Sequence, residues 1–155
     1  MTRNHRANNL AKWVSSHGSP IELSLKLESE QSTGSFKARG AVVAIGALLK
    51  VANAAGVRDV QAVTASTGNH GKATARAVSL WRSGEIRGFD QGRPSATLSP
   101  ARVHVPSNVA PHKLKALRDA GADIIVCSKP DCAIAESEAR SEAEATARPA
   151  ASGVT

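Results

Sequence analysis

The stretch Thr33-Gly34-Ser35-Phe36-Lys37-Ala38-Arg39-Gly40-Ala41 marks the point where a predicted strand gives way to a predicted helix. Residues 21–28 alternate apolar and polar side chains, as a half-buried strand does, and the apolar residues after the stretch recur at helical spacing to about Asn53. Gly34 is typical of a turn and Ser35 is a favoured N-cap residue, which places Lys37 in the first helical turn. A neutral lysine amine attacks carbonyl carbons, so Lys37 is a candidate nucleophile, although a solvated lysine on an ordinary helix has the same spacing.

A second strand, polar turn and helix follow in residues 60–81. The predicted strand 60–65 leads into Ser66-Thr67-Gly68-Asn69-His70-Gly71, and residues 72–81 form a helical pattern of small side chains. In an open α/β sheet, ligands bind beyond the carboxyl ends of the strands, where loop N–H groups and helix N-termini hold anions. The same residues also suit an ordinary capped turn. If the two loops serve one ligand, Lys37 and Asn69 lie near each other at that edge and face a common cleft.

The rest of the pattern predicts an α/β fold, an open and mostly parallel sheet of about four strands with flanking helices. Residues 102–106 and 123–127 favour strands, and residues 111–120 and 131–147 favour helices, which are the crossovers that parallel neighbours need. The positions expected in the core are Leu25, Leu27, Val43, Val63, Val78, Val105, Leu117, Ile125 and Val126.

Three segments are expected: an N-terminal segment 1–19, a domain 20–148 and a tail 149–155. Within the domain, residues 82–101 lack an apolar period, and Arg, Gly, Pro and Ser make up 11 of these 20 residues. This composition is typical of a flexible insertion and also of DNA read in a shifted frame. We expect residues 82–101 to lie outside the core; if they are a lesion, deleting 83–100 should leave stability unchanged or higher.

Composition narrows the function classes. The 155 residues, 41% of them hydrophobic and 21% charged, suit one globular domain, and neither a run of about 18 apolar residues nor a signal peptide is evident. We expect a cytoplasmic protein with no membrane partner. The formal charge of +7 suits an anionic small ligand, whereas scattered basic residues and 3% aromatics do not favour nucleic acid. Cys127 and Cys132 lack further ligands at a usual spacing, so free thiols and no metal are expected.

Together the two loop motifs resemble the pyridoxal-phosphate enzymes of the tryptophan synthase β group. The resemblance covers about residues 20–148, with one interruption, and implies a partial fold-type-II architecture. The branch that looks closest is the threonine/serine dehydratases, because related sulfhydrylases and threonine synthases typically carry an aspartate where this chain has Ala38. The matching residues are Leu25–Glu28, Gln31, Thr33–Lys37, Arg39–Ala41, Ala65–Gly71, Val103–Pro106, Lys113 and Gly121–Asp123.

By that resemblance Lys37 would form the aldimine with pyridoxal 5'-phosphate, Phe36 would pack near the cofactor ring, and Asn69 would hydrogen-bond its phenolic oxygen. The residues that would surround the substrate carboxylate are Ser66, Thr67, Gly68 and His70. The implied reaction converts L-threonine or L-serine to a 2-keto acid and ammonia, with Lys37 as the base. Serine racemases have a catalytic serine where this chain has Thr67, so a second base is not carried over.

Three interpretations stay open. The first is a dehydratase-type lyase whose remaining half comes from another chain or from a longer protein, since the glycine-rich phosphate cup and the partner of the pyridine nitrogen have no counterpart here. Whether the protein forms a homo-oligomer stays open. The second is a truncated, catalytically inactive relative of such an enzyme. The third is a basic nucleic-acid-binding module, which only the charge supports.

Overall fold

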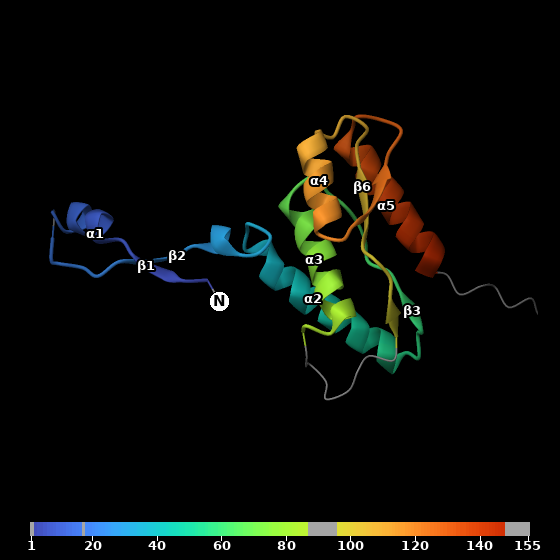
Figure 1. Cartoon of the computed structure of the whole chain (residues 1–155), viewed down its shortest axis with the longest axis horizontal. Helices are drawn as coiled ribbons and strands as arrows, with labels where there is room; N and C mark the ends of the chain where they lie inside the picture. Colours follow the sequence, from blue (N-terminus) through green and yellow to red (C-terminus); the bar gives the residue numbers. More distant parts are fainter. Residues whose placement is uncertain (1, 17, 87–95, 148–155) are drawn as a thin grey trace, which may run out of the picture.

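The computed structural model describes residues 2–16, 18–86 and 96–147 (Figure 1). Helices and strands alternate as expected, and the α/β class is confirmed. The elements in chain order are β1 (Asn4–Arg6), α1 (Asn8–Ser15), β2 (Ser24–Lys26), the short 3-10 helix η1 (Glu28–Glu30), α2 (Lys37–Ala54), β3 (Asp59–Val60), β4 (Val63–Ala65), α3 (Asn69–Ser83), β5 (Thr97–Leu98), β6 (Arg102–Val105), α4 (Pro111–Asp119), β7 (Asp123–Val126) and α5 (Cys132–Ala147).

The amino-terminal elements form an arm that lies away from the rest of the molecule (Figure 1). Here β2 pairs antiparallel with β1, with Leu25 opposite His5, and not with any strand of the parallel sheet. The expectation that residues 21–28 form the first strand of the parallel sheet is therefore wrong. The alternating pattern is real but short, and Leu25 is 41% exposed because the two-stranded ribbon has no layer packed on it.

The central sheet has the order β4-β6-β7, and both pairings are parallel. Ala65 lies opposite His104, and His104 lies opposite Ile125. Figure 1 shows α3 and α4 on one side of β6 and α5 on the other. This arrangement follows from the crossovers, because β4-α3-β6 and β6-α4-β7 each need a helix to return the chain to the start of the next parallel strand.

Upstream of the central sheet, β3 pairs in parallel with β5, with Val60 opposite Leu98. The register moves by one residue between this pair and the next, since Asp59 pairs with Thr97 and Val63 with Arg102. The segment between Leu98 and Arg102 is one residue longer than the segment between Val60 and Val63. Pro100 lies in this longer segment and has no N–H to donate, which accounts for the interruption of the strand pairing.

Residues 96–101 therefore belong to the folded core, against the expectation for residues 82–101. Ala96 and Leu98 are 8% exposed, and Ala101 is fully buried. Residues 82 and 83 close α3. Gly84 is the C-cap of α3, and Ile86 after it is half-buried. Residues 87–95 of the predicted insert lie outside the described residues.

The core lies between α2, α3 and the strands. Val78, Val105 and Leu117 are buried as predicted, and Leu27, Val63 and Ile125 are half-buried. Leu25, Val43 and Val126 are exposed, so these three core predictions are wrong. Val43 points away because the buried face of α2 carries Ile45, Leu49 and Ala52, and Val126 ends the edge strand of the sheet.

The two cysteines are free: Cys127 is buried and Cys132 is exposed. No helix within the described ranges is long and apolar enough to cross a membrane.

Candidate functional site

Lys37 is the first residue of α2, as the sequence predicted. Gly34 makes the preceding turn with a left-handed φ of 76°, which glycine adopts without strain. The predicted N-cap is wrong: Phe36 occupies that position, and no side chain caps the helix. The Ser35 hydroxyl is instead buried, and among the described residues it has no hydrogen-bond partner. The Lys37 Nζ lies 4.7 Å from the centroid of the Phe36 ring.

Lys37 opens onto a hollow of about 310 Å³ between α2 and α3. The two helices pack directly on each other, and the Trp81 indole of α3 donates a hydrogen bond of 3.1 Å to the Val42 carbonyl of α2. The hollow is therefore built by two helix starts, with walls that are mostly small and apolar. Its lining residues are Phe36, Lys37, Gly40, Ala41, Ala44, Ile45, His70 and Thr74.

The turn after β4 brings His70 to this hollow. The Ser66 N–H bonds to the His104 carbonyl and so continues the sheet by one residue, and the Ser66 hydroxyl then accepts a hydrogen bond of 3.2 Å from the Gly68 N–H. This local bond turns the chain into α3, whose first residues are Asn69 and His70.

The predicted site residues are only partly brought together. His70 lines the hollow with Lys37 and Phe36, whereas Asn69, one residue earlier, is exposed and lies outside the lining. Ser66 and Thr67 are half-buried and Gly68 is exposed, all in the turn next to His70. The roles assigned to Asn69, Ser66, Thr67 and Gly68 stay predictions.

Gly71 explains how α3 comes so close to the sheet. A β-carbon at this position would lie 3.0 Å from both Leu117 Cδ2 and the Ser66 carbonyl oxygen, and 3.1 Å from Val103 Cγ1. Only glycine fits here without a shift of the neighbours, one of which is backbone. The absence of a side chain at residue 71 therefore sets the position of the turn that carries His70.

Lys37 is positioned at the hollow by other contacts than we expected. We expected both loops to follow strands of one sheet, but β2 belongs to the amino-terminal arm. Lys37 lines the same hollow as His70 because α2 packs along α3, which does follow a sheet strand. Sequence reasoning also missed Gly40, Ala41 and Ala44, although these positions share one face with Lys37 at helical spacing.

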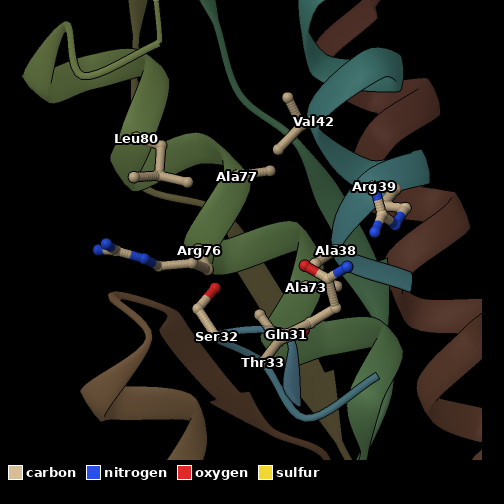
Figure 2. A pocket seen from close by; sticks show the side chains of 10 residues that line it. All are labelled: Gln31, Ser32, Thr33, Ala38, Arg39, Val42, Ala73, Arg76, Ala77 and Leu80. Atoms are coloured by element: carbon tan, nitrogen blue, oxygen red, sulfur yellow. The ribbon is translucent and has the colours of Figure 1, made fainter. Parts of the chain in front are cut away.

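A second hollow of about 260 Å³ lies on another face of the α2–α3 contact. Figure 2 shows Gln31, Ser32 and Thr33 at one end of it, and Ala77 opposite Val42 between the helices. None of the predicted site residues lines it. Its charged side chains are Arg39 and Arg76. Arg39 pairs with the carboxylate of Glu28, and Arg76 pairs with that of Glu85.

Comparisons with known proteins agree with one another and point to one enzyme family. Residues 2–80 match the family model described as pyridoxal-phosphate dependent enzyme. A protein of Sinorhizobium fredii named putative threonine dehydratase is 37% identical over 76% of this chain and 29% of its own length. The L-threonine ammonia-lyase of Geobacter sulfurreducens is 32% identical over 70% of this chain and 22% of its own length.

The fold agrees with the same group. The structure of threonine deaminase isoform 2 from Solanum lycopersicum superposes with a TM-score of 0.67 at 23% identity, over 93% of this chain and 34% of that one. The architecture is thus part of a fold-type-II pyridoxal-phosphate enzyme. The matches of this chain span less than a third of the length of the two curated relatives.

Proposed function

Because this chain belongs to the pyridoxal-phosphate-dependent enzymes, we propose that it supplies the lysine side of a lyase site that acts on a hydroxy amino acid, L-threonine or L-serine. The product would be a 2-keto acid, with release of ammonia. The observation that carries the proposal is the hollow that Lys37 and His70 line together, with the Lys37 amine 4.7 Å from the centroid of the Phe36 ring. The named relatives support the substrate class.

The residues at the hollow fit pyridoxal 5'-phosphate. A primary amine, an aromatic ring and an imidazole line one cavity, and at Gly40 a β-carbon would meet no atom within 4 Å. The Ser35 hydroxyl, two residues before Lys37, is a buried donor that still needs an acceptor. Within the described part of the chain, no carboxylate pairs with Lys37. A polar aromatic aldehyde suits the groups that line the hollow, although Ser35 is not one of them.

In the proposed site Lys37 would hold the cofactor through its amine, Phe36 would pack against the ring, and Asn69, by the family resemblance, would hydrogen-bond the phenolic oxygen. When bound, the cofactor supplies an electron sink for the carbon from which a proton leaves. Once the amine of the substrate has displaced Lys37 from the cofactor, the freed Lys37 Nζ would take the α-proton of the substrate, and the β-hydroxyl would leave. The turn Ser66, Thr67 and Gly68, with His70, would bind the substrate carboxylate through its N–H groups and side chains.

Turnover requires groups beyond those assigned here, above all a phosphate-binding loop and a partner for the pyridine nitrogen. We propose that a further polypeptide segment, outside these 155 residues, provides them, and that the protein acts in the cytoplasm. The basic charge of +7 then favours the anionic cofactor and substrate.

Borohydride trapping tests the site directly. The protein is incubated with pyridoxal phosphate, reduced, digested and mapped by mass spectrometry. We expect the label at Lys37, and we expect the near-ultraviolet absorbance of the bound cofactor to disappear in Lys37→Ala but persist in Lys50→Ala, because Lys50 is an exposed lysine of the same helix.

Equal labelling of Lys37 and Lys50 would show nonspecific reaction with surface amines and would contradict the proposal. Turnover is measured separately, as formation of a 2-keto acid from L-threonine and from L-serine. A protein that is labelled at Lys37 and forms no keto acid would support the interpretation as an inactive relative.

A further inference from the structure

A polar cluster lies on the other face of the sheet, under α5, and plays no part in the proposed lyase site. His104 of β6 is 4% exposed, and Cys127, directly after β7, is 3% exposed. Glu138 and Glu142 reach them from α5, where a spacing of four residues places both on one face of the helix. The apolar residues that α5 buries are small, Ala135 and Ala139, so the polar groups form a large part of its contact with the sheet.

The hydrogen bonds of His104 determine which ring nitrogen is free. Its Nε2 lies 2.7 Å from Glu142 Oε2, and a carboxylate can only accept, so Nε2 carries the proton. Arg102 pairs with the other oxygen of Glu142 and keeps the carboxylate in place. In the neutral ring, Nδ1 therefore presents a lone pair.

That lone pair faces two further metal-binding atoms. Cys127 Sγ lies 3.9 Å from His104 Nδ1, and Glu138 Oε2 lies 3.9 Å from the same nitrogen. All three ligand atoms lie within 4.8 Å of one another. On tetrahedral zinc, with bonds of about 2.0–2.3 Å, two ligand atoms are roughly 3.3–3.6 Å apart. The two distances of 3.9 Å exceed this by about 0.3–0.6 Å. The half-exposed Glu138 side chain can move toward His104, and the Cys127 and His104 side chains would have to close the remaining gap.

We propose that His104, Cys127 and Glu138 form a binding site for one divalent zinc ion, with the fourth position open to water. Glu142 acts as a positioning residue, because a carboxylate on the outer nitrogen fixes the tautomer and orientation of a metal-bound histidine. The spacing of these residues in the sequence gives no hint of the site, since the three ligands come from β6, the end of β7 and α5.

The site would bind α5 to the sheet. Burial raises the pKa of the Cys127 thiol to about 11, and Glu138 adds to the effect, so the thiol keeps its proton in the metal-free protein. When zinc binds, the S–H bond breaks, the proton passes to solvent, and the sulfur lone pair forms the Zn–S bond. The ion would then join β6, the end of β7 and α5, and the contact of α5 with the sheet otherwise depends on alanines and polar groups.

The test uses the full chain without an affinity tag, freed of metal and kept without pyridoxal phosphate. Zinc is titrated against a chromophoric chelator, and cobalt is added in parallel because a cobalt–thiolate bond gives a near-ultraviolet charge-transfer band. We expect one equivalent of zinc, a cobalt band and a higher thermal midpoint with zinc. Glu142→Gln should weaken binding by roughly 10- to 100-fold, the usual effect of losing such a positioning carboxylate.

The two cysteines provide a matched pair of variants. Cys127→Ser should abolish the cobalt band and the zinc-induced rise in the thermal midpoint, whereas Cys132→Ser, which changes an exposed thiol, should keep both. The cobalt spectrum of the unmodified protein decides the matter even if Cys127→Ser does not fold. The absence of a thiolate band, or loss of binding in Cys132→Ser alone, would overturn the proposal.

Discussion

Glu28 lies where the amino-terminal arm joins the body, and neighbouring side chains stabilise its ionised carboxylate. Arg39 Nε donates a hydrogen bond of 3.0 Å to its carboxylate, and Gln31 donates another of 2.9 Å. Lys26 stands further away, with its Nζ 3.8 Å from Oε1. The Arg39 and Gln31 hydrogen bonds, in that order, hold the pKa of the Glu28 carboxyl below its usual value.

We predict that Arg39→Ala brings the pKa of Glu28 back toward its usual value of 4.5, and that Lys26→Ala changes it less, because a direct hydrogen bond favours the ionised form more than a distant charge does. The pKa is measured by an NMR titration of the side-chain carboxyl. A larger change in Lys26→Ala would contradict this prediction.

The sign of the linkage follows from the lowered pKa. The folded state binds the Glu28 proton less tightly than the unfolded chain, so the contribution of Glu28 to stability is present above pH 4.5 and is lost as the pH falls through the folded pKa. Since the group is on the surface, this contribution is small and weakens further in salt.

At the scale of the element, α3 holds both the turn of the candidate site and the contact with α2. Its approach to the sheet depends on Gly71, and its end at Gly84 uses a left-handed φ of 74°. Small side chains on its buried face, Ala73, Ala75 and Ala77, allow the strands and α2 to pack closely on either side. The sequence pattern showed the helix, but not how close its neighbours are.

We predict opposite effects for two glycine-to-alanine substitutions. Gly71→Ala should destabilise the fold by about 1–3 kcal/mol, because the new methyl group meets Leu117, Val103 and the Ser66 backbone. Gly40→Ala should stabilise it by roughly 0.5–1 kcal/mol, because Gly40 lies inside α2 with open space around it and alanine is the better helix former. Urea unfolding of both variants is the measurement; a neutral Gly71→Ala would show that the packing is looser than the structure indicates.

At the scale of the whole molecule, the pairing of β3 with β5 brings residues 96–101 into the core, although their composition predicted a loop outside it. Leu98 and Ala96 pack in the same cluster as Ile45 and Leu49 of α2 and Val78 of α3. The Ala96 N–H also bonds to the side chain of Asn53 at the end of α2. Residues 96–101 therefore connect the distant end of α2 with the sheet.

We predict that Leu98→Ala costs about 2–4 kcal/mol of unfolding free energy, because it opens a cavity in that cluster. The matched control is Leu48→Ala on α2: Leu48 is 41% exposed, and its substitution should change stability by less than about 0.5 kcal/mol. Both are measured by urea unfolding.

For the same reason, deletion of residues 83–100 should destabilise the protein, since it removes β5. This prediction replaces the expectation of unchanged stability that the composition of the segment suggested. Unchanged stability in Leu98→Ala and in the deletion would return residues 96–100 to the status of a dispensable insert.

The sequence by itself determined the α/β class, the start of α2 at Lys37, the turn before α3 and the order of the helices after it, because these depend on local periodicity, glycine turns and the need for crossovers between parallel strands. The two ordered loop motifs were also sufficient to identify the family. Local rules carried this information because each helix, strand and turn is specified by residues that are close together in the sequence.

Only the tertiary structure decided which strands share a sheet and which groups meet. Residues 24–26 pair with residues 4–6, and residues 97–98 pair with residues 59–60. Both strand pairings join segments that are far apart in the sequence. Lys37 and His70 line one hollow through the packing of α2 on α3, and His104 meets Cys127 and Glu138 through three separate elements. Periodicity specifies which face of an element is apolar, but the partner of that face is fixed by the packing of the whole chain.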